Sequence, residues 1–289
     1  MTERKLHKPD WLKQRLSITE HLGNVRTAIR DLNLHTVCSE ALCPNRNRCF
    51  NDGQATFLLM GDICTRNCRF CAVKHGVPES LDDSEPERVA QAAVDMKLNY
   101  VVVTSVTRDD IADGGASQFA QTIREIHRIL PDVGIEVLIP DFCGQAGAIQ
   151  NVLDEKPDVL NHNVETIPRL YGDIRPEADF KRSVGILKFA KEYSNSLTKS
   201  GFMVGLGETK EEVFELMNDL KSADIDIITI GQYLQPSQNH YPIERFVTPE
   251  EFDEYVHFGE RELGISKVLA GPLVRSSYKA YEVWKALLA

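Results

Sequence analysis

Six of the seven cysteines in this 289-residue chain stand in two tight groups, and their thiols are the side chains best suited to chemistry. The members are Cys64, Cys68 and Cys71 in the segment GDICTRNCRFCAV, and Cys38, Cys43 and Cys49 in the segment TVCSEALCPNRNRCF. An odd total in two clusters is unlike a secreted disulfide framework. It favours reduced thiols that bind a metal or an iron–sulfur cluster.

The group at residues 64–71 has three thiols and no fourth cysteine. Its spacing also fits one face of a helix, but a buried helical stripe would more naturally use Leu or Ala. A structural zinc site has four protein ligands, and His75 is near enough in sequence to complete one. In a 4Fe–4S cluster, three thiolates would instead leave one iron open to a molecule other than protein. The spacing alone leaves both metal sites open.

Short β-branched runs alternate with amphipathic segments from residue 55 onward, which predicts strands alternating with helices. The predicted strands are 55–61, 99–106, 134–141, 159–166, 199–207 and 226–234, and the predicted helices lie near 85–97, 117–130, 144–154, 178–193 and 209–221. Such βα units in series imply a parallel sheet of the α/β class.

Six strands are too few for a closed eight-stranded barrel, so we predict a partial (βα)6 TIM-like barrel with N- and C-terminal extensions. A flat doubly wound sheet is the alternative. The predicted parts of one integrated domain are an N-terminal extension over 1–54, the barrel over 55–235 and a C-terminal extension over 236–289 that ends in a helix. In such sheets reactive groups gather at the carboxyl ends of the strands, and Cys64 directly follows the first strand.

Composition narrows the class of protein. Hydrophobic residues make up 42% of the chain, and no apolar run reaches the roughly 18 residues of a membrane span. The first residues lack the apolar core of a secretory signal, which predicts a cytoplasmic protein. A net charge of −10 argues against nucleic-acid binding, although the first fifty residues carry nine Lys and Arg against five Asp and Glu.

The pattern C-x3-C-x2-C after the first strand of a βα series, with Phe70 before the last cysteine, resembles the radical S-adenosylmethionine (SAM) superfamily. The resemblance implies a 4Fe–4S cluster held by Cys64, Cys68 and Cys71. In that superfamily the open iron binds the amino and carboxylate groups of SAM. An electron from the cluster then breaks a carbon–sulfur bond and gives a 5′-deoxyadenosyl radical.

The second cysteine group makes the resemblance more specific. The pattern C-x4-C-x5-C at 38–49 together with RSSY at 275–278 is similar to the lipoyl synthase family. Further segments occur in the expected order along nearly the whole chain: KPDWLK, TSVTRDDIADGGA, NHNVET, GLGET and GPLVRSSY. One departure is the basic stretch NRNRC, where Arg46 and Arg48 could adjust the docking of an acidic carrier.

The lipoyl synthase resemblance implies an auxiliary 4Fe–4S cluster on Cys38, Cys43 and Cys49, with Ser277 as its fourth ligand and Ser276 as the weaker choice. Without the family, either serine would be interpreted as the N-cap of the last helix. The implied reaction moves two sulfur atoms from this cluster to C6 and C8 of an octanoyl chain on a carrier-protein lysine, and it uses two SAM. Neither carbon is acidic, so hydrogen abstraction by a carbon radical is the plausible route.

Polar residues near the predicted strand ends are the candidate contacts of SAM. They are Thr104, Ser105, Asn161, Asn163, Glu165, Arg175 and Arg182. The two asparagines and the glutamate alternate along one predicted strand, so they share a face and suit ribose hydroxyls. Either arginine can pair with the SAM carboxylate. His162 points to the other face and is interpreted as an ordinary packed histidine, and Cys143 as a small buried residue.

The resemblance also implies partners. These are octanoylated lipoyl carrier proteins (the lipoyl domains of 2-oxoacid dehydrogenases and the H protein of glycine cleavage), an electron donor such as flavodoxin or ferredoxin, and an iron–sulfur carrier that rebuilds the cluster. Two alternatives remain. A biotin synthase-like sulfur-inserting enzyme would lack the 38–49 pattern and RSSY, and a non-catalytic iron–sulfur or zinc protein would need neither a large barrel nor an open iron.

Overall fold

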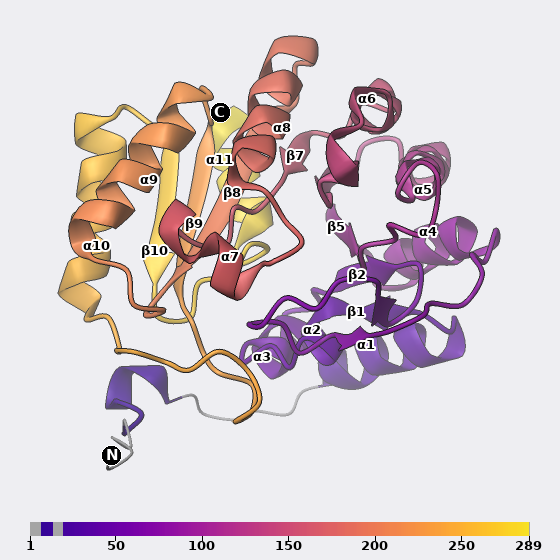
Figure 1. Ribbon diagram of the computed structural model, residues 1–289. Coiled ribbons are helices and arrows are strands. Elements are labelled where there is room, and N and C mark those ends of the chain that lie inside the picture. Colours follow the sequence, from indigo (N-terminus) through magenta and orange to yellow (C-terminus); the bar gives the residue numbers. More distant parts are fainter. Residues whose placement is uncertain (1–6, 14–19, 289) are drawn as a thin grey trace.

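The computed structural model describes residues 7–13 and 20–288 (Figure 1). Its main sheet has eight strands in these residues, in the spatial order β1-β2-β5-β6-β7-β8-β9-β10. The strands are β1 (His35–Thr36), β2 (Thr56–Leu59), β5 (Tyr100–Ser105), β6 (Gly134–Leu138), β7 (Val159–Asn161), β8 (Leu197–Val204), β9 (Ile227–Gln232) and β10 (Lys267–Gly271). The two short strands β3 (Ile63–Cys64) and β4 (Lys74–His75) form a separate pair.

Helices alternate with the strands and cover the outside of the sheet (Figure 1). The longer ones are α1 (Glu20–Asp31), α4 (Glu85–Asp95), α5 (Ala116–Ile129), α6 (Ala146–Asp154), α8 (Phe180–Tyr193), α9 (Lys210–Ser222), α10 (Pro249–His257) and α11 (Ala280–Leu288). The shorter ones are α2 (Val37–Glu40), α3 (Arg46–Asn51) and α7 (Tyr171–Ile174). All six predicted strands and all five predicted barrel helices are present.

The strand order shows which α/β fold the chain adopts. From β2 to β10 the strands are parallel and their spatial order follows their order in the chain. Each βα step therefore moves in one direction, as in a barrel, whereas a doubly wound sheet reverses direction part-way. In the described residues β1 and β10 do not pair, so the barrel is open along one side. The predicted partial barrel is confirmed.

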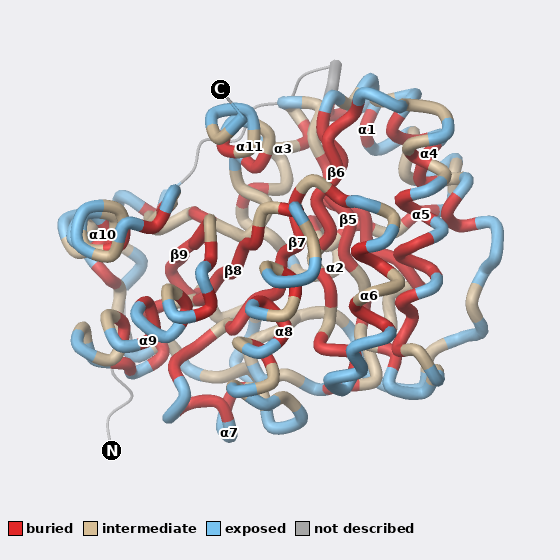
Figure 2. The backbone as a smooth tube through the Cα atoms, turned by 90° about the horizontal axis from the view of Figure 1, so that it is seen from above, coloured by how far each residue is buried: buried red, intermediate tan, exposed pale blue. Residues whose placement is uncertain are grey.

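The sequence accounts for this packing. The strands β2 and β9 are buried at every position, because one face lines the barrel interior while the other packs on helices. Figure 2 shows the same distribution, with buried residues along the strands and exposed residues on the outer helix surfaces. The start of α9 is fixed by a capping box, in which Thr209 accepts from the Glu212 backbone and Glu212 accepts from the Thr209 backbone.

The two edges of the open barrel come from the segments outside the predicted barrel. At one edge β1 pairs antiparallel with β2, and at the other β10 adds a seventh parallel strand beside β9. The sequence analysis did not predict β10. The side-chain amide of Asn45 donates to the carbonyl of Leu273 at 2.6 Å, which joins the segment after β1 to the segment after β10. The N- and C-terminal segments therefore meet across the open side of the barrel.

Candidate active site

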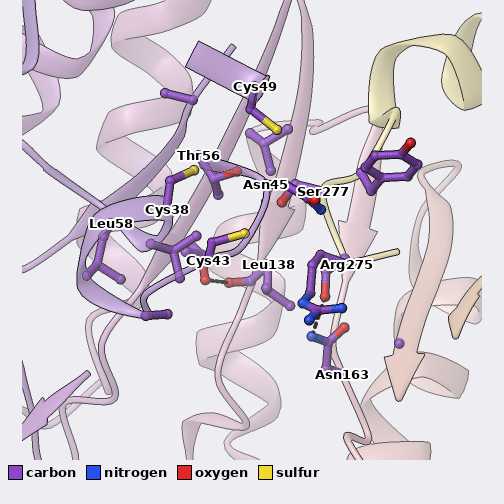
Figure 3. Close-up of a pocket in the computed structure, with 18 of the residues that line it drawn as sticks. Cys38, Cys43, Asn45, Cys49, Thr56, Leu58, Leu138, Asn163, Arg275 and Ser277 are labelled. Atoms are coloured by element: carbon purple, nitrogen blue, oxygen red, sulfur yellow. Dashed lines mark hydrogen bonds between the residues drawn. The ribbon is translucent and has the colours of Figure 1, made fainter. Parts of the chain in front are cut away.

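Both cysteine groups line one cavity of about 920 Å³. It begins at the carboxyl ends of β5 and β6 and continues between the N- and C-terminal segments at the open side of the barrel. Figure 3 shows Cys38, Cys43 and Cys49 with their sulfur atoms directed toward the segment that carries Arg275 and Ser277. Groups separated by more than 200 positions in the sequence are thus brought to one site.

The first cysteine group lies on a loop that begins in β3, directly after the buried strand β2. The backbone N–H of Thr107 donates to the Cys64 sulfur at 3.3 Å, and the ring of His240 contacts the Cys71 carbonyl at 3.0 Å through its Nε2. Burial raises the pKa of Cys71 to about 12 and also raises that of Cys68. These thiols are therefore protonated near neutral pH in the free protein, and a metal ion would have to displace their protons on binding.

The second cysteine group lies between β1 and β2. The Thr36 hydroxyl accepts from the Ser39 N–H and caps α2, which fixes Cys38 in the first turn. Cys43 follows that helix and Cys49 lies in α3. Burial raises the pKa of Cys38 to about 11 and that of Cys49 to about 12. This environment again favours neutral thiols until a cation is bound.

The two candidate serines have different surroundings. Ser276 accepts a hydrogen bond of 2.6 Å from the Asn163 side-chain amide. Ser277 lines the same cavity, and its hydroxyl has no hydrogen-bond partner in the part of the chain that the structure describes. Figure 3 places it beside Asn45, facing the second cysteine group. Ser277 is therefore the serine whose hydroxyl is available to a ligand.

The thiol spacing separates the two metal hypotheses. Among the described residues, only one group of His, Cys, Asp and Glu has all its ligand atoms within 4.8 Å of one another, and it contains neither cysteine triplet. Tetrahedral zinc, with Zn–S bonds of about 2.3 Å, requires its sulfurs within roughly 4 Å of each other. His75, the fourth ligand of the zinc hypothesis, is exposed and does not line the cavity. The spacing suits a cluster of several metal ions better than a single zinc ion.

Five of the seven predicted SAM contacts line the cavity: Thr104, Ser105, Asn163, Glu165 and Arg175. Three of these leave a buried polar atom without a partner among the described residues, namely Ser105 Oγ, Asn163 Oδ1 and Arg175 Nε. A buried polar atom without a hydrogen bond costs free energy, so such atoms around a cavity indicate a polar ligand. The residues present therefore fit a polar cofactor.

Comparison with known proteins decides the family. The pattern of the radical SAM superfamily matches residues 58–220, and that of the N-terminal domain of lipoyl synthase matches residues 1–43. The chain is 55% identical over 276 residues to the lipoyl synthase of Caldanaerobacter subterraneus subsp. tengcongensis, covering 95% of this chain and 96% of that one. It is 51% identical over 281 residues to that of Caldicellulosiruptor saccharolyticus, covering 97% and 98%.

The chain belongs to the lipoyl synthase family.

Solved structures agree with this family on the fold. Methylornithine synthase (PylB) superposes with a TM-score of 0.56 at 14% identity, covering 88% of this chain and 79% of that one. HydG, a maturase of the [FeFe]-hydrogenase, superposes with a TM-score of 0.61 at 15% identity, covering 78% and 53%. At these identities the likeness concerns the fold alone.

Two predicted SAM contacts of this lipoyl synthase family member lie away from the cavity. Asn161 donates to Glu136 at 3.0 Å, beside a buried ion pair of 2.8 Å between Glu136 and Lys199. Arg182 donates to Asp141 at 3.0 Å. The prediction of a shared face assumed a strand over 159–166, but β7 ends at Asn161 and the alternation stops there. Neither residue is part of the cavity lining, so the cavity supports only the other five predicted contacts.

His162 is a cavity residue that the sequence analysis missed. Its Nδ1 contacts the Ile139 carbonyl at 2.9 Å, and its Nε2 is buried without a partner among the described residues. Burial lowers the pKa of His162 to about 4, so the ring is neutral at physiological pH. The sequence signal for a cavity position was its place in the polar run NHN. Whether the ring faces the cavity depends on where β7 ends, which the sequence did not show.

Arg66, between the first two cysteines of the C-x3-C-x2-C loop, anchors that loop to the barrel. Its guanidinium donates to Asp141 at 2.7 and 3.0 Å and to Asp109 at 2.6 and 2.9 Å. Burial alone would raise the pKa of Asp141, but its bonds to Arg66 lower it to about 2. The loop is thereby fixed to the ends of two neighbouring strands.

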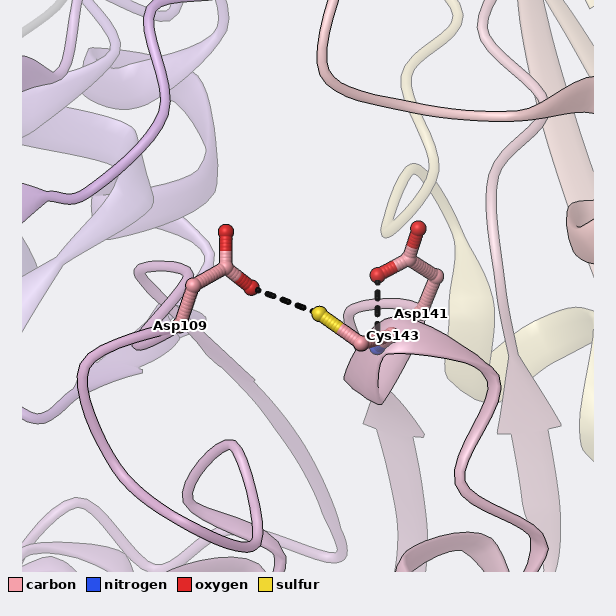
Figure 4. A group of neighbouring side chains, drawn as sticks. All are labelled: Asp109, Asp141 and Cys143. Atoms are coloured by element: carbon pink, nitrogen blue, oxygen red, sulfur yellow. Dashed lines mark hydrogen bonds between the residues drawn. The ribbon is translucent and has the colours of Figure 1, made fainter.

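Cys143 lies beside this network, and its sulfur is 3.3 Å from Asp109 (Figure 4). The interpretation of Cys143 as a buried residue is wrong, because a turn with a φ of 52° at this position leaves the side chain exposed. Asp109, Asp141 and Cys143 are the close group of ligand atoms noted above. They do not make a convincing metal site, because Arg66 and Arg182 already neutralise the carboxylates.

We expect Arg66→Ala to destabilise the iron-free chain by about 3 kcal/mol, because it leaves the fully buried Asp141 carboxylate without its main partner. Arg182→Ala is the matched control. Its side chain is 35% exposed and Asp141 keeps Arg66, so the loss should stay below about 1 kcal/mol. Urea unfolding measures both values. Equal losses would show that Arg66 is not the anchor of the loop.

None of the helices described is both long and apolar enough to cross a membrane.

Proposed function

We propose that this chain is a lipoyl synthase that inserts two sulfur atoms, at C6 and C8, into an octanoyl chain carried on a protein lysine. The observation that carries the proposal is that two cysteine triplets and Ser277 line one cavity in a chain of this family. A single triplet would suit many enzymes that cleave SAM. A second triplet facing the same space suits a reaction in which that space also receives sulfur.

Cys64, Cys68 and Cys71 are the proposed ligands of the 4Fe–4S cluster that the radical SAM superfamily implies. When bound, this cluster and SAM supply a carbon radical strong enough to take hydrogen from an unactivated carbon. Around them Ser105, Asn163 and Arg175 offer unpartnered polar atoms that can hold the cofactor. Glu165 is also at this site, where its side chain accepts from Asn163 at 3.0 Å.

The second triplet, with Ser277, is the proposed holder of an auxiliary 4Fe–4S cluster, which would supply the sulfur atoms. A serine oxygen is a harder and less usual iron ligand than a thiolate, which suits a site that must release part of what it binds. Asn45 supports this arrangement because its bond to Leu273 ties the cysteine segment to the serine segment.

Apolar side chains in the cavity lining form the proposed path for the octanoyl chain. Leu58, Val102, Leu138 and Val274 line the cavity and are at most partly exposed. An apolar lining binds a hydrocarbon chain and keeps water away from a reactive radical. The protein's own part in the reaction is thus to hold the chain with its reacting carbons between the two metal sites.

Replacing Ser277 by Ala should lower the iron content of the auxiliary site and sulfur insertion, while SAM cleavage continues. We expect a loss of insertion of about tenfold or more, as for groups that support a metal centre. Ser276→Ala is the matched control, because that hydroxyl is already bonded to Asn163. Iron analysis and product mass after turnover measure both. If the Ser276 variant lost more auxiliary iron than the Ser277 variant, the ligand assignment would be reversed.

The proposed partners follow from this function. They are octanoylated lipoyl carrier proteins (lipoyl domains of 2-oxoacid dehydrogenases and the glycine cleavage H protein), a flavodoxin- or ferredoxin-like electron donor, and an iron–sulfur carrier. All seven cysteines are free thiols, which agrees with a reducing compartment such as the cytoplasm. The test of the function is incubation of the reconstituted protein with dithionite, SAM and an octanoyl-lysine peptide, with a mass gain from two sulfur atoms as the expected result.

A further inference from the structure

The cavity reaches solvent at Asn67 in the C-x3-C-x2-C loop and also at residues outside that loop. Several of the residues that line it there are exposed: Asn24, Leu42, Asp52, Asp95, Lys97 and Asn99. They belong to the segments that precede β2 and β5 and to the loop of the second cysteine group. Leu42, next to Cys43, is 62% exposed, which is unusual for a large apolar side chain. This opening is where a long substrate can leave the cavity.

Two tyrosines of the C-terminal segment line the cavity and have cationic side chains over their rings. Arg48 and Lys279 lie 5.7 and 5.8 Å from the ring centre of Tyr278, and Lys285 lies 5.6 Å from that of Tyr281. The three cations are exposed and do not themselves line the cavity, so they lie outside it around the two tyrosine rings.

We call Arg48, Lys97, Lys279 and Lys285 the cationic rim. All four are exposed, and in the described residues none forms an ion pair with a carboxylate. Some other exposed cations are paired, as Arg124 is with Glu155, whereas others such as Lys156 and Arg261 form no ion pair with a described residue. The acidic groups at the same opening are Asp52 and Asp95, with Glu282 on α11, so positive charges outnumber negative ones only slightly. This slight excess of positive charge at the opening differs from the chain as a whole, whose net charge is −10.

We propose that the cationic rim is the docking surface for the folded domain of the carrier protein, and that this domain presents an acidic face around its acylated lysine. The proposal rests on the proposed function, because the acyl chain must enter the cavity while its carrier stays outside. The chain as a whole is acidic, but the cationic rim carries positive charges that no carboxylate of the described residues neutralises. Such a rim favours a partner with negative charge at the surface that it presents. Leu42 supplies an apolar contact within the same surface.

The test separates docking from chemistry by using two substrates. The variant Lys279→Glu/Lys285→Glu reverses two rim charges at positions away from the cysteines. With an octanoylated carrier domain at low salt, we expect kcat/KM to fall by about tenfold or more, because exposed charges act mainly on association. With a short octanoyl-lysine peptide without acidic residues, turnover should change little. The difference should shrink in 0.5 M salt, since the charges are then screened.

Lys181→Glu/Lys188→Glu is the matched control, because it makes the same charge change on the exposed face of α8, outside the barrel. It should leave carrier turnover unchanged. If both double variants lowered carrier turnover equally, net charge and not the rim would be responsible. If the rim variant lost self-association in sedimentation while carrier turnover was retained, the rim would instead bind a second copy of the chain. Either result overturns the proposal.

The experiment distinguishes failure of the proposed function from failure of the proposed docking surface. If the unmodified protein added no sulfur to either the peptide or the carrier domain, the function would be wrong. If it processed both, and the rim variant matched it on the carrier domain, only the docking surface would be wrong.

Discussion

Replacing Cys64, Cys68 or Cys71 by Ala should abolish reductive cleavage of SAM and, with it, sulfur insertion. Each cysteine is a proposed ligand of the cluster that delivers the electron, and loss of outer-shell partners alone costs a metal site about 10–100-fold. Loss of a direct ligand should therefore lower cleavage by more than about 100-fold. The measurement is 5′-deoxyadenosine formed after addition of dithionite and SAM.

Cys143→Ala is the matched control for this prediction. Cys143 is exposed and lies outside both cysteine groups, so its replacement should preserve SAM cleavage and sulfur insertion. Cleavage that persisted after loss of Cys68 or Cys71 would mean that these thiols do not hold the cluster that reacts with SAM.

Replacing Cys38, Cys43 or Cys49 by Ala should abolish sulfur insertion but not SAM cleavage. SAM cleavage should continue, because the 64–71 loop has its own contacts to Thr107 and His240 and the ion pair of its Arg66 with Asp109. None of these contacts depends on the second cysteine group. Sulfur insertion should cease, and bound iron should fall by about four per chain, the content of one cluster. Cleavage and product mass are read from the same reaction mixture.

Comparing the two sets of variants tests whether one cysteine triplet serves SAM cleavage and the other serves sulfur insertion. The variants of each group serve as controls for the other, since all six replace a buried or partly buried thiol in the same cavity. If all six lost cleavage and insertion together, the triplets would act as one centre or support only the fold.

The barrel could be predicted from local patterns. The runs that became β5 and β9 are β-branched and buried at nearly every position, and they alternate with helices whose starts carry strong caps such as Thr209. In contrast, β10 was missed. It is partly exposed along most of its length and follows a segment without a comparable periodic pattern, so its pairing with β9 depends on tertiary contacts.

The cysteine ligands were easier to propose than their surroundings. Their type and spacing are visible in the sequence. In contrast, β7 ends five residues earlier than predicted, so that His162 lines the cavity and Asn161 does not. A strand end is decided by which backbone groups find partners, and a shift of one residue turns the next side chain to the other face. The contact of Asn45 with Leu273, across the open side of the barrel, has no local sequence signal at all.

The most direct test of the account is the amount of iron and acid-labile sulfide per chain after anaerobic reconstitution, followed by turnover with dithionite, SAM and an octanoyl-lysine peptide. Two clusters predict about eight irons per chain. They also predict 5′-deoxyadenosine and a peptide that has gained two sulfur atoms. About four irons with cleavage but no sulfur transfer would contradict the auxiliary cluster, and zinc without iron would contradict both metal sites.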